Sequence, residues 1–201
     1  MVKKVIYFVR HGETLFNRMK KIQGSSDIEL SDIGREQAKN VKGLEGIFFD
    51  KLLHSGLKRS KETLEIIKKS NNLENNIEEN DLLKERSYGI FEGLTEIEIE
   101  GKYSILYDEW KKNENAKIEG SESIDAVIER FLKFCNIVRD NDFKSYLCVT
   151  HSGFLYAIYK YITNTDLGIR PKIKFLNCSL SILNINDDKL EFIIGNETYV
   201  N

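Results

Sequence analysis

The feature that most constrains the fold is a run of five apolar residues, Val5 to Val9, which ends directly at Arg10 and His11. Continuous β-branched and aromatic residues are typical of a strand that is buried on both faces of a sheet. The segment Tyr146–Val149 has the same character and is followed closely by His151. Because such strands need helices on both sides, the sequence predicts an α/β fold.

Helical patterns alternate with the expected strands. Ser31 is the expected N-cap of a helix that runs to Leu44, and further helices are expected at about 57–70, 123–139 and 153–162. Further strands are expected at 47–53, 178–185 and 190–194, the last two joined by a hairpin-like turn at 186–188. The prediction is a three-layer sandwich with a mainly parallel central sheet and helices on both faces.

Two stretches are predicted to lie outside this alternation. Residues 71–80 are rich in Asn and Glu and are expected to form a solvated connector. The glycine-punctuated stretch Leu82–Gly93 is expected to form a short strand and a loop, and the region after it an irregular helix. The stretch Leu82–Gly93 and the region after it predict an insertion near 82–122 over the active site.

Length and charge exclude several classes of protein. A chain of 201 residues is expected to form a single domain, 1–201. With 30 basic and 32 acidic residues the net charge is −2, so we expect no nucleic-acid and no membrane-surface partner. There is no apolar run long enough to span a bilayer and no signal-peptide pattern, which favours a cytoplasmic protein. The sequence carries no signal for an oligomeric state.

Metal and disulfide chemistry are not expected. The three cysteines, Cys135, Cys148 and Cys178, are far apart and form no CxxC pair, which is typical of free buried thiols. The three histidines occur in no HExxH motif and no Cys/His cluster, so we expect no metal site and no cofactor.

Charged side chains follow three of the predicted strands. Arg10 and His11 follow the first, Arg59 lies at the start of the helix after the second, and His151 follows the third. Parallel sheets bind ligands at the carboxyl ends of their strands, so these groups are expected to meet at one edge. Arginines, a helix N-terminus and a neutral imidazole suit a phosphate group and nucleophilic attack on phosphorus. A carboxylic acid is then needed to protonate the leaving oxygen, and composition leaves its identity open among 32 candidates.

Four ordered blocks extend this pattern. They are Arg10-His11-Gly12-Glu13-Thr14 with Asn17, continued by Gln23-Gly24, Asp27, Leu30-Ser31, Gly34 and Gln37-Ala38; Ser55 to Ser60; Leu83, Glu85, Gly89, Glu92 and Gly93; and Val149-Thr150-His151-Ser152-Gly153. The blocks resemble the histidine phosphatase superfamily, which includes the cofactor-dependent phosphoglycerate mutases. Two positions depart from the family pattern: Gly56 stands where proline is common, and Ser152 where glycine is commoner.

The resemblance implies a role for each matching residue. His11 would be phosphorylated, and Arg10, Arg59 and His151 would bind the phosphate. Glu85 would act as proton donor and then as base for water, with Glu92 as the alternative acid in the same stretch. Glu13 is expected to support the loop rather than to transfer protons. The resemblance also implies substrate-binding roles for Asn17, Gln23, Gly24, Ser152 and Tyr88.

The resemblance favours a metal-independent phosphatase acting on a small phosphorylated metabolite. Glu85-Arg86-Ser87-Tyr88-Gly89 is similar to the mutase version of its block, but the insertion lacks the paired arginines and the proline-rich run of mutases. A phosphoglycerate mutase is therefore one alternative, and a non-catalytic phospho-ligand binding module on the same fold is another. Nothing in the insertion selects the leaving group among sugar phosphates, phosphoglycerate, a cobalamin nucleotide-loop precursor and phosphoprotein.

Overall fold

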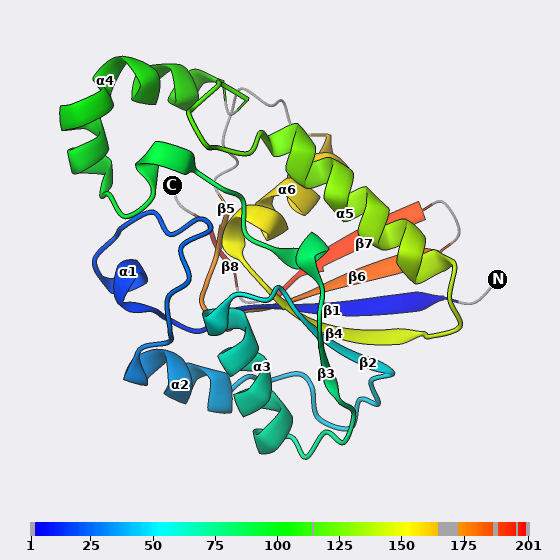
Figure 1. Cartoon of the computed structure of the whole chain (residues 1–201). Coiled ribbons are helices and arrows are strands. Elements are labelled where there is room, and N and C mark those ends of the chain that lie inside the picture. The colour runs from blue at the N-terminus through cyan, green and yellow to red at the C-terminus, as the bar shows by residue number, and fades with distance from the viewer. Residues whose placement is uncertain (1–2, 114, 165–172, 187–188, 196, 200–201) are drawn as a thin grey trace.

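The central element is a six-stranded sheet (Figure 1). The computed structural model describes residues 3–113, 115–164, 173–186, 189–195 and 197–199. In spatial order the strands are β3 (Ile77–Glu79), β2 (Lys51–His54), β4 (Ser145–Thr150), β1 (Lys4–Arg10), β6 (Leu180–Asn186) and β7 (Lys189–Ile194). The first four are parallel to one another, whereas β6 is antiparallel to β1 and β7 is antiparallel to β6. The predicted α/β class with a mainly parallel sheet is confirmed.

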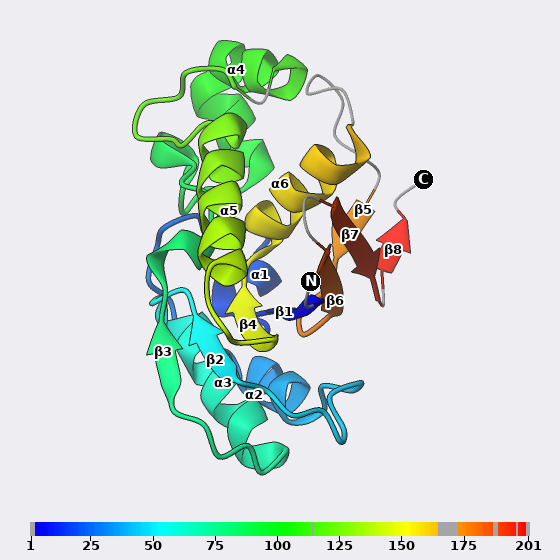
Figure 2. The ribbon, with the colours of Figure 1, turned by 90° about the vertical axis from the view of Figure 1, so that its right-hand side faces the viewer.

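Helices cover both faces of the sheet, as Figure 2 shows along the strands. One face carries α2 (Asp32–Lys39) and α3 (Lys58–Ser70), and the other carries α5 (Ile124–Arg139) and α6 (Ser152–Thr163). The short helix α1 (Leu15–Arg18) follows β1, and a two-stranded sheet pairs β5 (Ile173–Phe175) with β8 (Glu197–Tyr199). Along the described residues, no helix combines the length and the apolar character that a bilayer crossing requires.

The apolar run of β1 is buried on both faces, as its composition predicts. Phe8 packs against Phe134 of α5 and Phe154 of α6, with ring centroids 6.5 and 6.0 Å away. Its neighbour Val9 belongs to a second cluster on the opposite face with Leu64 of α3. Side chains alternate across a strand, so one continuous run serves both cores.

The insertion carries a small core of its own. It contains two 3₁₀ turns, η1 (Asp81–Leu83) and η2 (Gly89–Phe91), and the helix α4 (Glu96–Lys112), which kinks at Tyr103. Phe91, Trp110 and three other buried apolar residues form a cluster separate from the two that flank the sheet. We call this cluster the insertion core. Its members are Phe91, Ile99, Tyr107, Trp110 and Ile118.

Helix starts were predicted well because they depend on local capping. Ser31 caps α2, its Oγ accepting a hydrogen bond of 3.1 Å from the amide of Gly34, and Ser123 caps α5 in the same way. Such a cap stabilises a helix by about 1 kcal/mol. The predicted end of α2 at Leu44 was wrong. The helix stops at Lys39, and Val41 and Leu44 reach the core from a turn rather than from a helix face.

The connector and the stretch after it were also assigned incorrectly. The connector holds the edge strand β3, in which Ile77 pairs with Leu52 of β2. An edge strand exposed to water needs little apolar character, so pairing rather than composition defines it. In the stretch Leu82–Gly93, the expected strand is replaced by η1 and η2. The side chain of Asn80 accepts a hydrogen bond from the Leu82 amide and starts the first of these turns.

Candidate active site

Strand register brings the two candidate histidines together. Arg10 at the end of β1 lies opposite Thr150 at the end of β4, so His11 and His151 leave the sheet at the same level. Their ring centroids are 5.1 Å apart, and both residues are buried. The His11 amide donates to the Thr150 carbonyl at 3.0 Å, which fixes the start of the loop. The shared strand edge that the sequence predicts is therefore present.

A hydrogen bond sets the tautomer of His11. Its Nδ1 lies 2.7 Å from the carbonyl oxygen of Gly12. A carbonyl can only accept, so Nδ1 carries the proton and Nε2 keeps its lone pair. Burial, followed by the charges of Arg59 and Arg10, holds the pKa of His11 well below its ordinary value. The imidazole is therefore neutral at neutral pH, which is the form that can attack phosphorus.

Two arginines flank this imidazole and are fixed by backbone carbonyls. Arg59 donates to the carbonyls of Ser26 at 2.6 Å and Gly24 at 2.8 Å, and Arg10 donates to that of Phe175 at 2.6 Å. Burial lowers the pKa of Arg59 to about 10, so the guanidinium stays charged at neutral pH. Both cations are therefore held in place before any ligand binds.

Three buried nitrogen atoms around His11 have no hydrogen-bond partner among the described residues. They are Nε of Arg10, Nε of Arg59 and Nδ1 of His151. Buried polar atoms are paired in more than about 90% of cases, so the two unpaired guanidinium N–H donors at this single site indicate a ligand rich in acceptors. A tetrahedral oxyanion has that chemistry. Among the residues described, no group of three His, Cys, Asp or Glu side chains is placed to hold a metal ion.

Two serines orient His151. Its Nε2 lies 2.6 Å from Ser55 Oγ, which lies 2.7 Å from Ser60 Oγ, and Ser60 donates to the Leu57 carbonyl at 2.7 Å. With Ser60 committed to Leu57, one consistent direction is donation from His151 Nε2 to Ser55 and from Ser55 to Ser60. That direction leaves Nδ1 unprotonated while His151 is neutral, so Nδ1 can donate to a bound oxyanion only once the imidazole takes up a proton. We did not assign Ser55 to the site from sequence, although it stands directly after β2.

Glu85 and Glu92 occupy different environments. Glu85 Oε1 accepts from the amides of Arg86 (2.9 Å) and Phe154 (3.2 Å), and its Oε2 accepts from the Gly153 amide, at 3.2 Å, and from no other described residue. A Cβ at Gly153 would lie 2.5 Å from Glu85 Oε1, so a larger residue there would displace the carboxylate from this position. By contrast, both carboxylate oxygens of Glu92 bind groups of the surrounding loops. Glu92 therefore holds these loops together.

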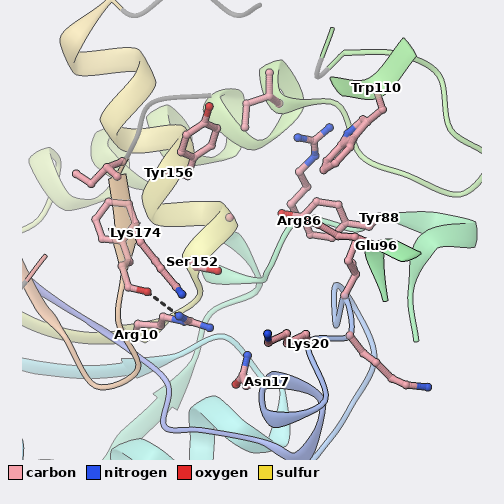
Figure 3. A pocket seen from close by; sticks show the side chains of 16 residues that line it. Arg10, Asn17, Lys20, Arg86, Tyr88, Glu96, Trp110, Ser152, Tyr156 and Lys174 are labelled. Carbon is pink, nitrogen blue, oxygen red and sulfur yellow. Dashed lines mark hydrogen bonds between the residues drawn. The ribbon is translucent and has the colours of Figure 1, made fainter. Parts of the chain in front are cut away.

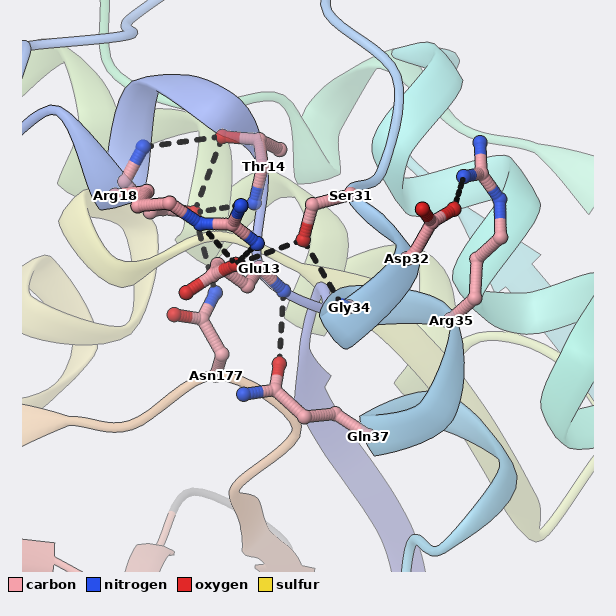
Figure 4. A network of polar contacts seen from close by, with 10 residues as sticks. Glu13, Thr14, Arg18, Ser31, Asp32, Gly34, Arg35, Gln37 and Asn177 are labelled. Carbon is pink, nitrogen blue, oxygen red and sulfur yellow. Dashed lines mark hydrogen bonds and ion pairs between the residues drawn. The ribbon is translucent and has the colours of Figure 1, made fainter.

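The loop after His11 is held by a polar network (Figure 4). Glu13 accepts from Ser31 Oγ at 2.7 Å and from Arg18 at 2.8 Å, contacts that lower the pKa of its carboxyl group. Asn177 donates to the His11 carbonyl at 2.8 Å and to Asn17 Oδ1 at 3.3 Å. With Oδ1 of Asn17 also bound to Thr14, its amide nitrogen is the atom that faces the open side (Figure 3). Glu13 thus supports the loop, and sequence reasoning missed Asn177.

Two adjoining hollows open over these groups. The smaller, about 200 Å³, is lined by His11, Glu85 and others, and the larger, about 440 Å³, extends from Arg10 towards Trp110 (Figure 3). The remaining candidate substrate-binding residues line one or both hollows. These are Asn17, Gln23, Gly24, Tyr88 and Ser152.

Comparison with known proteins agrees with this geometry. Residues 6–198 match the family described as the histidine phosphatase superfamily, branch 1. The chain belongs to the histidine phosphatase superfamily.

Relatives of this superfamily member include both phosphatases and mutases. It is 32% identical to a metal-independent phosphoserine phosphatase of Arabidopsis thaliana, over 92% of this chain and 77% of that protein. It is 31% identical to a 2,3-bisphosphoglycerate-dependent phosphoglycerate mutase of Buchnera aphidicola, over 82% and 86%. Among solved structures, Bacillus stearothermophilus YhfR aligns with a TM-score of 0.84 at 26% identity, over 95% of this chain and 96% of that one.

The two departures from the family pattern have different consequences in this chain. Gly56 has φ +85°, which proline cannot adopt, and its amide donates to His54 Nδ1 at 3.0 Å. The turn before α3 is therefore built differently here, yet it still delivers Ser55 and Arg59. Ser152 begins α6 and lines both hollows beside Arg10.

Proposed function

We propose that this chain is a metal-independent phosphomonoester hydrolase that acts on a small phosphorylated metabolite through a phosphohistidine. The observation that carries the proposal is the set of three unpaired buried nitrogens, from Arg10, Arg59 and His151, around a neutral His11. Donors fixed in advance around the transferred group stabilise the charge on its equatorial oxygens.

In the first step His11 Nε2 attacks phosphorus and the bond to the ester oxygen breaks. Glu85, in its protonated form, donates its proton to the leaving oxygen. Its Oε2 accepts a single hydrogen bond, from Gly153, and so has room for that proton. We assign Asn17 an additional hydrogen bond to the phosphoryl group, since its amide nitrogen faces the hollow.

In the second step Glu85, now a carboxylate, takes a proton from water. The water oxygen attacks phosphorus, the bond between phosphorus and Nε2 breaks, and inorganic phosphate leaves. His11 returns to its neutral form and Glu85 to its protonated form, so the cycle closes without any other reactant.

The test must separate hydrolysis from phosphoryl return, because relatives of both kinds exist. We expect net release of inorganic phosphate from a panel of phosphate monoesters, measured by a colorimetric phosphate assay. In parallel, 3-phosphoglycerate is incubated with catalytic 2,3-bisphosphoglycerate and followed by ³¹P NMR. Rapid interconversion to 2-phosphoglycerate without phosphate release would overturn the hydrolase in favour of a mutase. Absence of turnover in both assays would favour a non-catalytic phospho-ligand binding module.

The three histidines are expected to stay neutral to unusually low pH. Burial is the largest cause that lowers the pKa of His11, of His151 and of His54, and for His11 and His151 the neighbouring arginines add to it. We expect the three imidazole resonances in an NMR titration to titrate below about pH 6.5. A His11 resonance that titrates at or above this value would contradict the neutral nucleophile.

The same pKa shifts predict how stability depends on pH. Below about pH 6.5 the unfolded chain binds protons that the folded histidines do not, so unfolding becomes easier as the pH falls towards the folded-state pKa values. Each of His11 and His151 contributes up to about 1.4 kcal/mol per pH unit in that window. Urea denaturation between pH 7 and 5 measures this, and a midpoint that does not fall would contradict it.

A further inference from the structure

The larger hollow has a pronounced excess of positive charge. Beyond Arg10, which faces the phosphoryl site, its described lining includes four basic residues and one carboxylate, Glu96. The four basic residues are Lys20, Lys21, Arg86 and Lys174. Two of them, Lys20 and Lys174, extend towards the end of the hollow that holds Arg10 and Asn17 (Figure 3). This charge lies where a leaving group would extend from the phosphorus atom.

Lys20 occupies a backbone position that disfavours lysine. It follows the C-cap of α1, with φ +56°, and its amide donates to the Asn17 carbonyl at 3.1 Å. Helices commonly end with glycine or asparagine in this left-handed conformation, because other side chains are strained there. Backbone strain of this kind is often retained at functional sites.

Lys174 reaches the same place from a distant part of the chain. It lies in β5, directly before Phe175, whose carbonyl accepts from Arg10. Neither Lys20 nor Lys174 forms an ion pair with any described residue, whereas Lys39 and Lys84, for example, pair with neighbouring carboxylates. Two exposed ammonium groups on separate elements therefore converge beside the phosphoryl site without a protein counter-ion among the described residues.

We propose that the leaving group of the substrate carries a second anionic group, a carboxylate or a phosphate, which Lys20 and Lys174 bind. This inference rests on the proposed hydrolase, because it places the ester oxygen at Arg10 and His11 and the second anion at the far side of the same substrate. The substrate class is thus a phosphate monoester of a small acid or a bisphosphate rather than of a neutral alcohol.

Binding to the His11→Ala protein tests the second site without relying on turnover. Calorimetry compares 3-phosphoglycerate with glycerol 3-phosphate, which differ by the carboxylate, and fructose 1,6-bisphosphate with fructose 6-phosphate, which differ by a phosphate. At low salt we expect the more acidic member of at least one pair to bind about tenfold more tightly, as expected of charge-assisted contacts. The pair that shows the preference identifies which of the two anions the site takes.

The double substitution Lys20→Asn with Lys174→Gln, in the same background, should reduce that preference to about onefold to twofold. Asparagine tolerates the left-handed backbone, so the change removes charge without adding strain at residue 20. Lys42→Asn with Lys133→Gln removes the same charge from exposed positions away from the hollows and should leave the preference unchanged.

Equal binding within both pairs, or a preference that survives the Lys20 and Lys174 substitutions, would overturn the second anion site. Phosphate release by the wild-type protein is measured separately on the same ligands. A binding preference without release from any ligand would refute the hydrolase and leave the anion site standing. Release without any preference in binding would refute the anion site and leave the hydrolase standing.

Discussion

Replacing His11 by alanine is expected to lower the turnover number for phosphate release by about 10⁴-fold or more, the usual cost of removing a covalent nucleophile. The imidazole is neutral, its Nε2 is unprotonated, and two fixed arginines flank it. The other buried imidazole at the site, His151, is committed through Nε2 to Ser55. Steady-state phosphate release, with circular dichroism to verify folding, measures the loss.

Rapid quenching gives a second readout for the same variant. The wild-type protein should yield an acid-labile, base-stable phosphoprotein during turnover, and His11→Ala should yield none. His54→Gln is a matched control, because His54 is buried but lines neither hollow. Glutamine also keeps a hydrogen-bond acceptor near the Gly56 amide. A phosphoprotein that persists in His11→Ala would refute His11 as the nucleophile.

Replacing Glu85 by glutamine is expected to lower turnover by about 10² to 10⁴-fold on alkyl phosphates, the range for loss of a general acid. Glutamine preserves the shape and one oxygen for the Arg86 and Phe154 amides, loses the contact with the Gly153 amide, and cannot donate an acidic proton. The loss should be much smaller on 4-nitrophenyl phosphate, whose leaving group needs no proton. The comparison is made on the turnover number of each substrate.

Glu92→Gln separates the two candidate acids. Glu92 braces the loops of Ser25 and Tyr88 and lines neither hollow. Its substitution should lower the melting temperature and leave the ratio of alkyl to aryl turnover unchanged. If Glu92→Gln changes that ratio and Glu85→Gln does not, the roles are reversed and Glu92 is the proton donor.

The parts of the fold that the sequence predicts are those with strong local signals. The apolar runs of β1 and β4 and the serine caps of α2 and α5 are each encoded within a few residues. The parts of the fold that were predicted incorrectly depend on contacts with residues far away in the sequence. β3 exists because Ile77 pairs with Leu52, and no composition rule for an Asn- and Glu-rich segment indicates that pairing.

Among the residues of the candidate site, those with a local sequence signal could likewise be predicted, and the others could not. His11, His151 and Arg59 could be placed together because they follow strands of one parallel sheet, and the motif resemblance added Glu85. Asn177 could not be found, because it reaches the His11 loop from far along the chain and stands in no recognisable pattern. Lys20 was missed for another reason: its signal is a backbone dihedral angle, which sequence alone does not display.

The separate insertion core has a consequence for how this chain could be diversified. Phe91, Trp110 and the other members of that cluster pack chiefly on one another, whereas His11 and His151 are positioned by the strands beneath and Glu85 by the start of α6. The part of the insertion after Glu92 can therefore accumulate mutations, or be exchanged between relatives as a cassette, with modest effect on the phosphate chemistry, whereas Glu85 before it must be kept. Libraries that vary its cavity-facing residues and preserve these aromatic rings are a direct route to variants with new substrate preferences.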